Sequence, residues 1–229
     1  MEYPVILHID TSTELCSVAL SHGSNCIDVR ENSEGRNHAA LLTLFCEDIL
    51  NTNNVSVKQI DAVAVSSGPG SYTGLRIGVS TAKGLCYGAN IPLIAVSTLQ
   101  AMSLGVAVNH DIPEDALLCP MIDARRMEVY TALFNKEGKQ IKEISAEIIT
   151  EQSFFTLLSE SQIFFFGNGA EKCKDTVKHH NAIFSNDFRH SAIYMIQPAL
   201  QAFNKKKFED VAYFEPYYLK DFIAGPKKK

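Results

Sequence analysis

The sequence predicts an α/β protein of two lobes, each built on a mixed β-sheet. The first half of the chain reads as a hairpin of strands followed by alternating helices and strands, and the second half gives that order again. A chain of 229 residues, of which 46% are hydrophobic, can form one large domain or two small ones. We place the boundary near Leu104, with a first lobe over 1–104, a smaller second lobe over 105–209, and a last segment over 210–229 that can pack back on the first.

The elements of the first lobe follow from short apolar runs separated by turn signals. The run 5–9 predicts a buried strand that ends at Asp10-Thr11-Ser12. The turn residues 21–25 join strands over 16–20 and 26–30 into a hairpin. The rest of the lobe alternates, with helices predicted over 38–50, 71–87 and 97–108 and strands over 60–66 and 92–96.

The second lobe starts again with two strands, predicted over 116–123 and 128–134 and followed by a turn over 135–138. The apolar run 163–166 predicts another strand, because the turn Gly167-Asn168-Gly169 closes it. Helical patterns follow over 191–203, and no low-complexity segment interrupts the order.

Composition and charge exclude several classes of protein. The net charge of −5 makes the chain a poor stand-alone nucleic-acid binder, because phosphate contacts by Lys and Arg drive such binding. Lysines cluster at 205–207 and 227–229, and the second cluster either contacts RNA or is simply solvated. The first residues lack the basic start of a signal peptide and no run of about 18 residues is free of polar side chains, so we expect a cytoplasmic protein without a membrane span. The six scattered cysteines lack zinc-ligand spacing and read as buried thiols in a reducing compartment.

A glycine-rich stretch, SSGPGSYTGLRIGVSTAKGLCYG at 66–88, raises the question of a nucleotide site. A P-loop requires a second glycine followed by Lys-Ser/Thr, and this sequence has Thr73 or Leu75 at the required position. A dinucleotide fingerprint fails as well, because Gly74 comes one place too late. Both phosphate-binding motifs are therefore excluded, although any helix N-terminus can attract an anion.

The same glycines fit a packing role better. Gly70, Gly74, Gly78 and Ala82 recur every four residues and therefore lie along one helix face. A face of small residues forms a groove that another backbone can approach closely. The groove serves either a partner protein or the seating of the helix on its own sheet, and this helix alone does not decide between them.

The preceding helix, over 38–50, carries more apolar side chains than one sheet can cover. Leu41, Leu44 and Phe45 cannot all point inward together with the apolar residues on the other side of the same helix. An exposed apolar patch of this kind usually marks a partner. Together, the two neighbouring helices predict a protein–protein interface.

Several motifs, spread in order over nearly the whole chain, resemble those of the TsaB (YeaZ) family. They are ILHIDTS at 6–12, SGPGSYTGLRIG at 67–78, AKG at 82–84, VSTL at 96–99, DARR at 123–126, EVY at 128–130, GNGA at 167–170 and PYYLK at 216–220. The resemblance implies the actin-like, hexokinase-like (ASKHA) fold, a duplicated ribonuclease-H-like architecture. It also implies a role in adding a threonylcarbamoyl group to N6 of the adenosine beside the anticodon, in tRNAs that read codons starting with A.

In that family the chain is a non-catalytic scaffold, so the resemblance implies partners. These are the catalytic paralogue TsaD, the ATPase TsaE, a second copy of the chain when TsaD is absent, and tRNA reached indirectly through the complex. Docking is expected through the two helices described above. The residues predicted for the interface are Leu41, Leu42, Phe45, Gly70, Tyr72, Thr73, Gly74, Ile77, Gly78 and Ala82.

The resemblance implies no metal, cofactor or catalytic residue on this chain, with ATP and metal expected on the partner subunits. TsaD carries two histidines four residues apart on the helix after the strand that corresponds to 92–96. Here those positions are Thr98 and Met102. A hydroxyl is a poor ligand and a thioether prefers soft metals, so neither residue replaces a histidine.

Some residues keep two interpretations. Nucleotide-using relatives of this fold place a phosphate loop where Asp10, Thr11 and Ser12 lie, whereas the simpler interpretation is a turn with an Asx-type hydrogen bond. Asp123-Ala124-Arg125-Arg126 either forms a salt-bridged hairpin or faces RNA or nucleotide, and His8 reads as a core histidine. The alternatives to a scaffold are a stand-alone ATPase or metallopeptidase-like enzyme and an RNA-binding module that uses Lys227 to Lys229.

Overall fold

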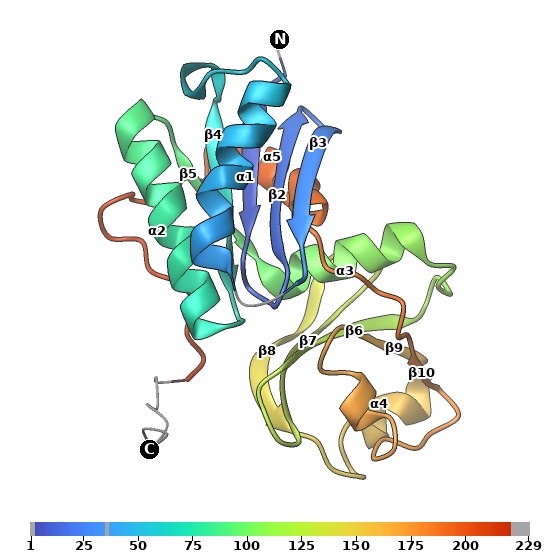
Figure 1. Cartoon of the computed structure of the whole chain (residues 1–229). Coiled ribbons are helices and arrows are strands. Elements are labelled where there is room, and N and C mark those ends of the chain that lie inside the picture. Colours follow the sequence, from blue (N-terminus) through green and yellow to red (C-terminus); the bar gives the residue numbers. More distant parts are fainter. Residues whose placement is uncertain (1–2, 35–36, 221–229) are drawn as a thin grey trace, which may run out of the picture.

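The computed structural model describes residues 3–34 and 37–220, which form two lobes with one five-stranded sheet each (Figure 1). The strand order is β3-β2-β1-β4-β5 in lobe 1 and β10-β9-β6-β7-β8 in lobe 2. Both sheets place antiparallel strands beside parallel ones, with the central strand, β1 or β6, paired in both ways. The predicted α/β class with two mixed sheets is therefore confirmed.

Lobe 1 is built on strands that match the predicted apolar runs closely. They are β1 (Val5–Asp10), β2 (Cys16–His22), β3 (Asn25–Asn32), β4 (Ala62–Gly68) and β5 (Leu93–Ser97). Strands β1, β4 and β5 are parallel, so their carboxyl ends meet at the edge of the sheet that faces lobe 2 (Figure 1). Residues from the loops at these ends are thereby brought together.

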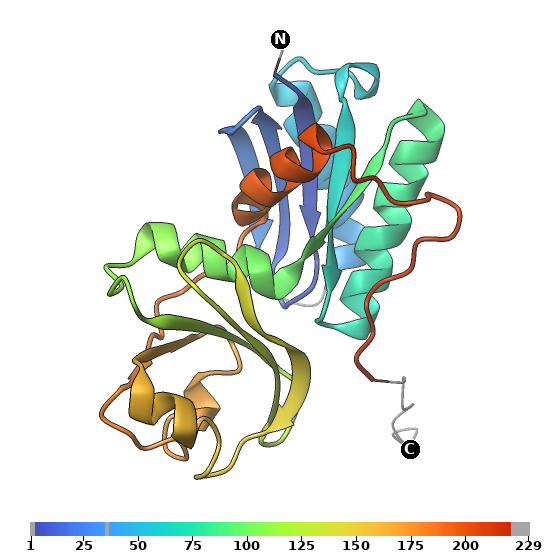
Figure 2. The same cartoon turned by 180° about the vertical axis from the view of Figure 1, so that it is seen from behind.

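Helices cover both faces of this sheet. On one face lie α1 (His38–Thr52) and α2 (Tyr72–Ala89), whose buried side chains join those of the strands in one apolar core. On the other face lie the short 3-10 helix η3 (Ala192–Met195) and α5 (Ile196–Asn204), as Figure 2 shows from behind. The prediction that 105–209 forms the second lobe is therefore wrong for 192–204, which returns to lobe 1 because its apolar residues cover the second face of that sheet.

Helix α3 (Thr98–Asn109) joins the two lobes and lies between their sheets (Figures 1 and 2). Its Ala101 packs in the core of lobe 1, whereas Met102 and Val106 pack in a core of lobe 2. A helix that is apolar on all sides needs such double cover. The boundary predicted near Leu104 therefore falls inside a buried helix that both lobes share.

Lobe 2 contains two strands and one α-helix that the sequence did not predict. Its predicted strands are β6 (Leu117–Asp123), β7 (Glu128–Phe134) and β9 (Ile163–Phe166). The additional elements are β8 (Gln140–Ile148), α4 (Phe155–Glu160) and β10 (Ala182–Phe184). Strand β8 was missed because it is a largely exposed edge strand rich in Lys and Glu, so it lacks an apolar run.

The described part of the chain ends with a strap, residues 205–220, that runs along the edge of lobe 1 beside α2 (Figure 2). The backbone N–H of Glu209 donates to the carbonyl of Leu93, and that of Tyr217 donates to the carbonyl of Ser67. Lys83 on α2 donates to the carbonyls of Ala212 and Phe214. Of the predicted 210–229 segment, residues 221–229, with the lysines at 227–229, lie outside the described residues.

Candidate functional site

The space beside the glycines at the start of α2 is occupied by other atoms of this same chain. A Cβ added to Gly74 would lie 2.0 Å from the carbonyl oxygen of Thr11, and one on Gly78 would lie 2.3 Å from Thr11 Oγ1. A Cβ on Gly70 would lie 2.3 Å from the carbonyl oxygen of Ser12. The prediction that these three glycines form a groove for a partner is therefore wrong: they let α2 sit directly on the loop that ends β1.

The remaining predicted interface residues divide into buried and accessible ones. Leu42 and Ala82 are fully buried in the core of lobe 1, so they cannot touch a partner. Leu41, Phe45 and Ile77 are half-buried and pack against that core. Tyr72 is half-buried with its ring beside that of Tyr218, and Thr73 is exposed.

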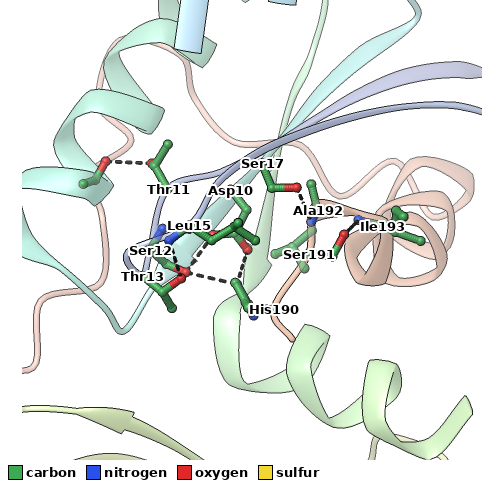
Figure 3. Close-up of polar contacts among 12 residues, drawn as sticks. Asp10, Thr11, Ser12, Thr13, Leu15, Ser17, His190, Ser191, Ala192 and Ile193 are labelled. Atoms are coloured by element: carbon green, nitrogen blue, oxygen red, sulfur yellow. Dashed lines mark hydrogen bonds and ion pairs between the residues drawn. The ribbon is translucent and has the colours of Figure 1, made fainter. Parts of the chain in front are cut away.

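The loop of Asp10, Thr11 and Ser12 is fully buried and held by internal hydrogen bonds (Figure 3). The backbone N–H and Oγ of Ser12 both donate to Asp10 Oδ1, at 2.9 and 2.7 Å, and Thr11 Oγ1 donates to the carbonyl of Gly74 at 2.7 Å. The Asx-type bond expected for a turn is thus present. Because these polar groups are bonded within the chain, the geometry favours a structural turn and does not fit a phosphate loop.

His190 closes this loop from the segment that returns from lobe 2 (Figure 3). Its Nε2 lies 2.6 Å from Asp10 Oδ2 and 3.3 Å from Ser12 Oγ. Burial alone would raise the pKa of Asp10, but His190 and the hydrogen bonds from Ser12 hold it below the usual value. A hydrolytic triad uses one histidine nitrogen for the acid and the other for the nucleophile. Here one nitrogen faces both groups and Ser12 is buried, so the three residues form a structural clasp between distant parts of the chain.

Thr98 and Met102, the positions of the histidine pair in TsaD, are buried between the lobes. Met102 Cε lies 2.7 Å from where a Cβ on Gly167 would stand, so the thioether fills the contact between α3 and lobe 2. Across residues 3–34 and 37–220, no group of three or more His, Cys, Asp or Glu side chains is placed to hold a metal ion. Met102 therefore acts in packing between the lobes, and Thr98 is a buried residue at the start of α3.

His8 is a core histidine, as predicted. It is fully buried in β1, and its Nε2 lies 2.8 Å from Ser21 Oγ. Burial lowers the pKa of His8 to about 3, because a charged imidazole would lose its hydration there. The ring is therefore neutral at physiological pH and takes no part in an accessible site.

A second row of residues on α2, small except for the half-buried Ile77, faces outward instead. Its members follow one another at intervals of three or four residues and are Thr73, Ile77, Ser80, Gly84 and Gly88. A Cβ added to Gly84 or Gly88 would meet nothing within 4 Å. The sequence analysis missed this row, although the buried row of Leu75, Val79 and Cys86 on the opposite side of the helix marks it.

Helix α1 adds an apolar side chain and a pocket to the same side. Leu44 is 56% exposed. A pocket of about 250 Å³ opens between α1 and α2 and is lined by Cys46, Leu50, Val55, Val57, Thr81 and Leu85, among others. We call this outward side of α1 and α2 the helix face, consisting of Leu44, Thr73, Ile77, Ser80, Gly84, Gly88 and the pocket. It is an accessible surface, with Glu47 as a charged residue at the pocket, and an accessible surface with apolar groups can receive a partner.

No helix among the residues that the structure describes combines the length and the apolarity that a membrane crossing requires.

Comparison with known proteins gives consistent results. Residues 31–224 match the family model described as TsaD: tRNA N6-adenosine threonylcarbamoyltransferase. Two proteins named tRNA threonylcarbamoyladenosine biosynthesis protein TsaB are similar over nearly full length. The one from Haemophilus influenzae is 31% identical over 99% of this chain and 98% of its own, and the one from Escherichia coli is 32% identical over 97% of each.

A solved structure supports the fold. YeaZ from Pseudomonas aeruginosa is 24% identical and superposes with a TM-score of 0.82, covering 94% of this chain and 100% of the other. Together with the two mixed sheets, this match confirms the actin-like, duplicated ribonuclease-H-like fold.

Proposed function

This chain belongs to the TsaB family, and on that premise we propose that it acts in tRNA threonylcarbamoyladenosine biosynthesis as a non-catalytic subunit. In this role it binds TsaD through the helix face and favours the competent conformation of that enzyme. ATP and metal act on the partner subunits, with TsaE joining the pair. When TsaD is absent, two copies of the chain meet through the same face.

The non-catalytic role draws support from the residues at the carboxyl ends of the lobe 1 strands. In folds of this kind, ligands and chemistry gather at those ends. Here Asp10 and Ser12 bond to each other and to Nε2 of His190 in a buried clasp, and Met102 fills the contact between the lobes. Nδ1 of His190 is buried and has no hydrogen-bond partner among the described residues. Side chains that are already bonded to one another and shielded from solvent are poor candidates for reaction with a substrate.

The observation that carries the docking proposal is the helix face itself. Gly84 and Gly88 leave the outward side of the C-terminal part of α2 without side chains, and the pocket between α1 and α2 offers about 250 Å³ for a projecting apolar group. The match to the TsaD family model includes α1 and α2, so TsaD has corresponding helices. Two related subunits can therefore join like two copies in a symmetric dimer, with the same face on each side.

The test is co-purification of this chain with TsaD, followed by sizing of the complex. Gly84→Leu places a bulky side chain where nothing is now within 4 Å, so the monomer should stay folded while binding weakens at least tenfold. Leu44→Asp should weaken binding as well, because it sets a charge in an apolar contact. Gln201→Leu is the matched control, since it adds an exposed leucine on α5, on the other face of the sheet.

Unchanged binding of TsaD by folded Gly84→Leu protein would remove the basis of the proposal. Gly74→Leu is unsuitable for this purpose, because it would clash with Thr11 of the same chain and unfold the protein. Sizing of the chain without TsaD tests the homodimer, which Gly84→Leu should convert to a monomer.

A further inference from the structure

Four tyrosines from three separate parts of the chain meet at one place between the lobes. Tyr72 stands at the start of α2, Tyr130 lies on β7 of lobe 2, and Tyr217 and Tyr218 belong to the strap. Together with Pro69, Gly70 and Lys220 they line one shallow depression. Such a concentration of aromatic rings on an accessible surface is unusual in a chain with only eight tyrosines and no tryptophan.

Contacts between the backbone of the strap and the end of β4 fix the position of these rings. The N–H of Tyr217 donates to the carbonyl of Ser67 at 2.7 Å, and the missing side chain of Gly68 leaves room for the carbonyl of Tyr217. The rings of Tyr72 and Tyr218 lie 4.9 Å apart, tilted by 36°. Even so, Tyr217 is 49% and Tyr218 37% exposed. The strap therefore presents rigid aromatic surface to the solvent.

Positively charged side chains of α2 and of the strap lie beside this tyrosine cluster. The guanidinium of Arg76 lies 5.5 Å from the centre of the Tyr72 ring. On the lobe 2 side, Lys220 pairs with Glu128, whose N–H donates to the carbonyl of Arg125 in the neighbouring hairpin. Arg125 and Arg126 are both exposed and both have a left-handed backbone, with φ of 72° and 51°.

Among the described residues, no carboxylate forms an ion pair with Arg76, Arg125 or Arg126. Of the acidic groups nearby, Glu128 is paired with Lys220 and Asp123 with Lys172, while Glu215 on the strap is exposed. The local balance is positive, although the whole chain is acidic.

We propose that the tyrosine cluster and these arginines bind an unpaired stretch of RNA directly. Bases would stack on Tyr217 and Tyr218, and the backbone phosphates would contact Arg76, Arg125 and Arg126. Flat aromatic surface bordered by guanidinium groups is the chemistry that recognises single-stranded nucleic acid, whereas a duplex hides its base faces. The inference rests on the proposed function only in taking tRNA, through one of its loops, as the source of that RNA.

The test is fluorescence anisotropy of the full chain with a labelled RNA hairpin that has an unpaired loop, and with a blunt RNA duplex of the same length. We expect tighter binding of the hairpin. Tyr217→Ala should weaken it roughly tenfold, the loss of one stacked base, whereas Tyr217→Phe should retain it. Tyr213→Ala is the matched control, because Tyr213 is 84% exposed on the same strap but does not line the depression.

Salt dependence separates the charged contacts from the stacking. Each of Arg76→Gln, Arg125→Gln and Arg126→Gln should lower the slope of log affinity against log salt by about 0.7, the value for one phosphate contact to a single strand. Tyr217→Ala should leave the slope unchanged. Equal affinity for hairpin and duplex, or unchanged hairpin binding by folded Tyr217→Ala protein, would overturn the inference.

The same variants should also be sized with TsaD. Retained TsaD binding by Tyr217→Ala protein that has lost RNA affinity supports an RNA surface distinct from the helix face. Loss of TsaD binding with unchanged RNA affinity would assign the tyrosine cluster to a protein contact and overturn the inference. If the unaltered chain does not bind TsaD, the proposed function is contradicted. The RNA measurements alone then decide whether the tyrosine cluster binds RNA.

Discussion

The two sides of α2 carry glycines for opposite reasons. On the inner side, Gly74 and Gly78 have no side chain because Thr11 of the same chain occupies the space. On the outer side, Gly84 and Gly88 have no side chain although nothing lies within 4 Å of the place where one would be. Glycine spacing in a sequence therefore shows that a helix face is bare, but only the surroundings show whether this chain or another one uses it.

The largest effect of a substitution on stability is expected on the inner side of α2. Gly74→Ala places a Cβ 2.0 Å from a backbone oxygen, which cannot move without shifting the loop after β1. The change should lower the free energy of unfolding by about 3 kcal/mol or more, even though alanine is the better helix former. Urea denaturation followed by circular dichroism measures this. Near wild-type stability would mean that the inner side is not sealed.

The sequence could predict the elements but not which side of α2 faces inward. Apolar runs and turn signals are local, so they fixed most strands and helices to within a few residues. The buried row of Leu75, Val79 and Cys86 was also visible in the sequence, and it places Gly74 and Gly78 beside the core. The four-residue spacing of Gly70, Gly74, Gly78 and Ala82 was assigned to a partner because the neighbouring helix, 38–50, carries more apolar side chains than one sheet can cover.

Other parts of the site depend on contacts that no local pattern records. The clasp joins Asp10 to His190, which are 180 residues apart. The strap owes its position to backbone hydrogen bonds with β4 and β5 and to Val211 and Phe214, which pack against the core of lobe 1. Likewise, the tyrosine cluster gathers residues from α2, β7 and the strap, so only the folded chain brings them together.

The second largest effect is expected from acid, which should lower the free energy of unfolding through His8. His8 lies in β1, the strand on whose end Gly74 rests, and burial lowers its pKa to about 3 from the usual 6.5. Above pH 6.5 the imidazole is neutral in both states and contributes its full stability. As the pH falls from 6.5 towards 3, the unfolded chain binds a proton that the folded chain does not, so stability is lost by about 1.4 kcal/mol per pH unit.

Between pH 7 and pH 5 the loss attributable to His8 should reach about 2 kcal/mol. It is measured as the difference in pH dependence between the unaltered chain and His8→Gln, which can keep a hydrogen bond to Ser21 but does not titrate in this range. Parallel stability curves for the two proteins would show that His8 is hydrated in the folded state and that β1 is open to water.

The smallest effect on stability is expected on the outer side of α2, and its sign should be opposite to that on the inner side. Gly84→Ala adds a methyl group into open space within a regular helix, so it should raise the free energy of unfolding by about 0.5–1 kcal/mol. Urea denaturation beside Gly74→Ala would then show opposite signs for one substitution at two positions of one helix. A loss of stability in Gly84→Ala would mean that the outer side is packed like the inner one. A gain in stability for Gly84→Ala would show that folding does not require glycine at position 84. The close approach of a partner helix would then be the physical reason for a glycine there.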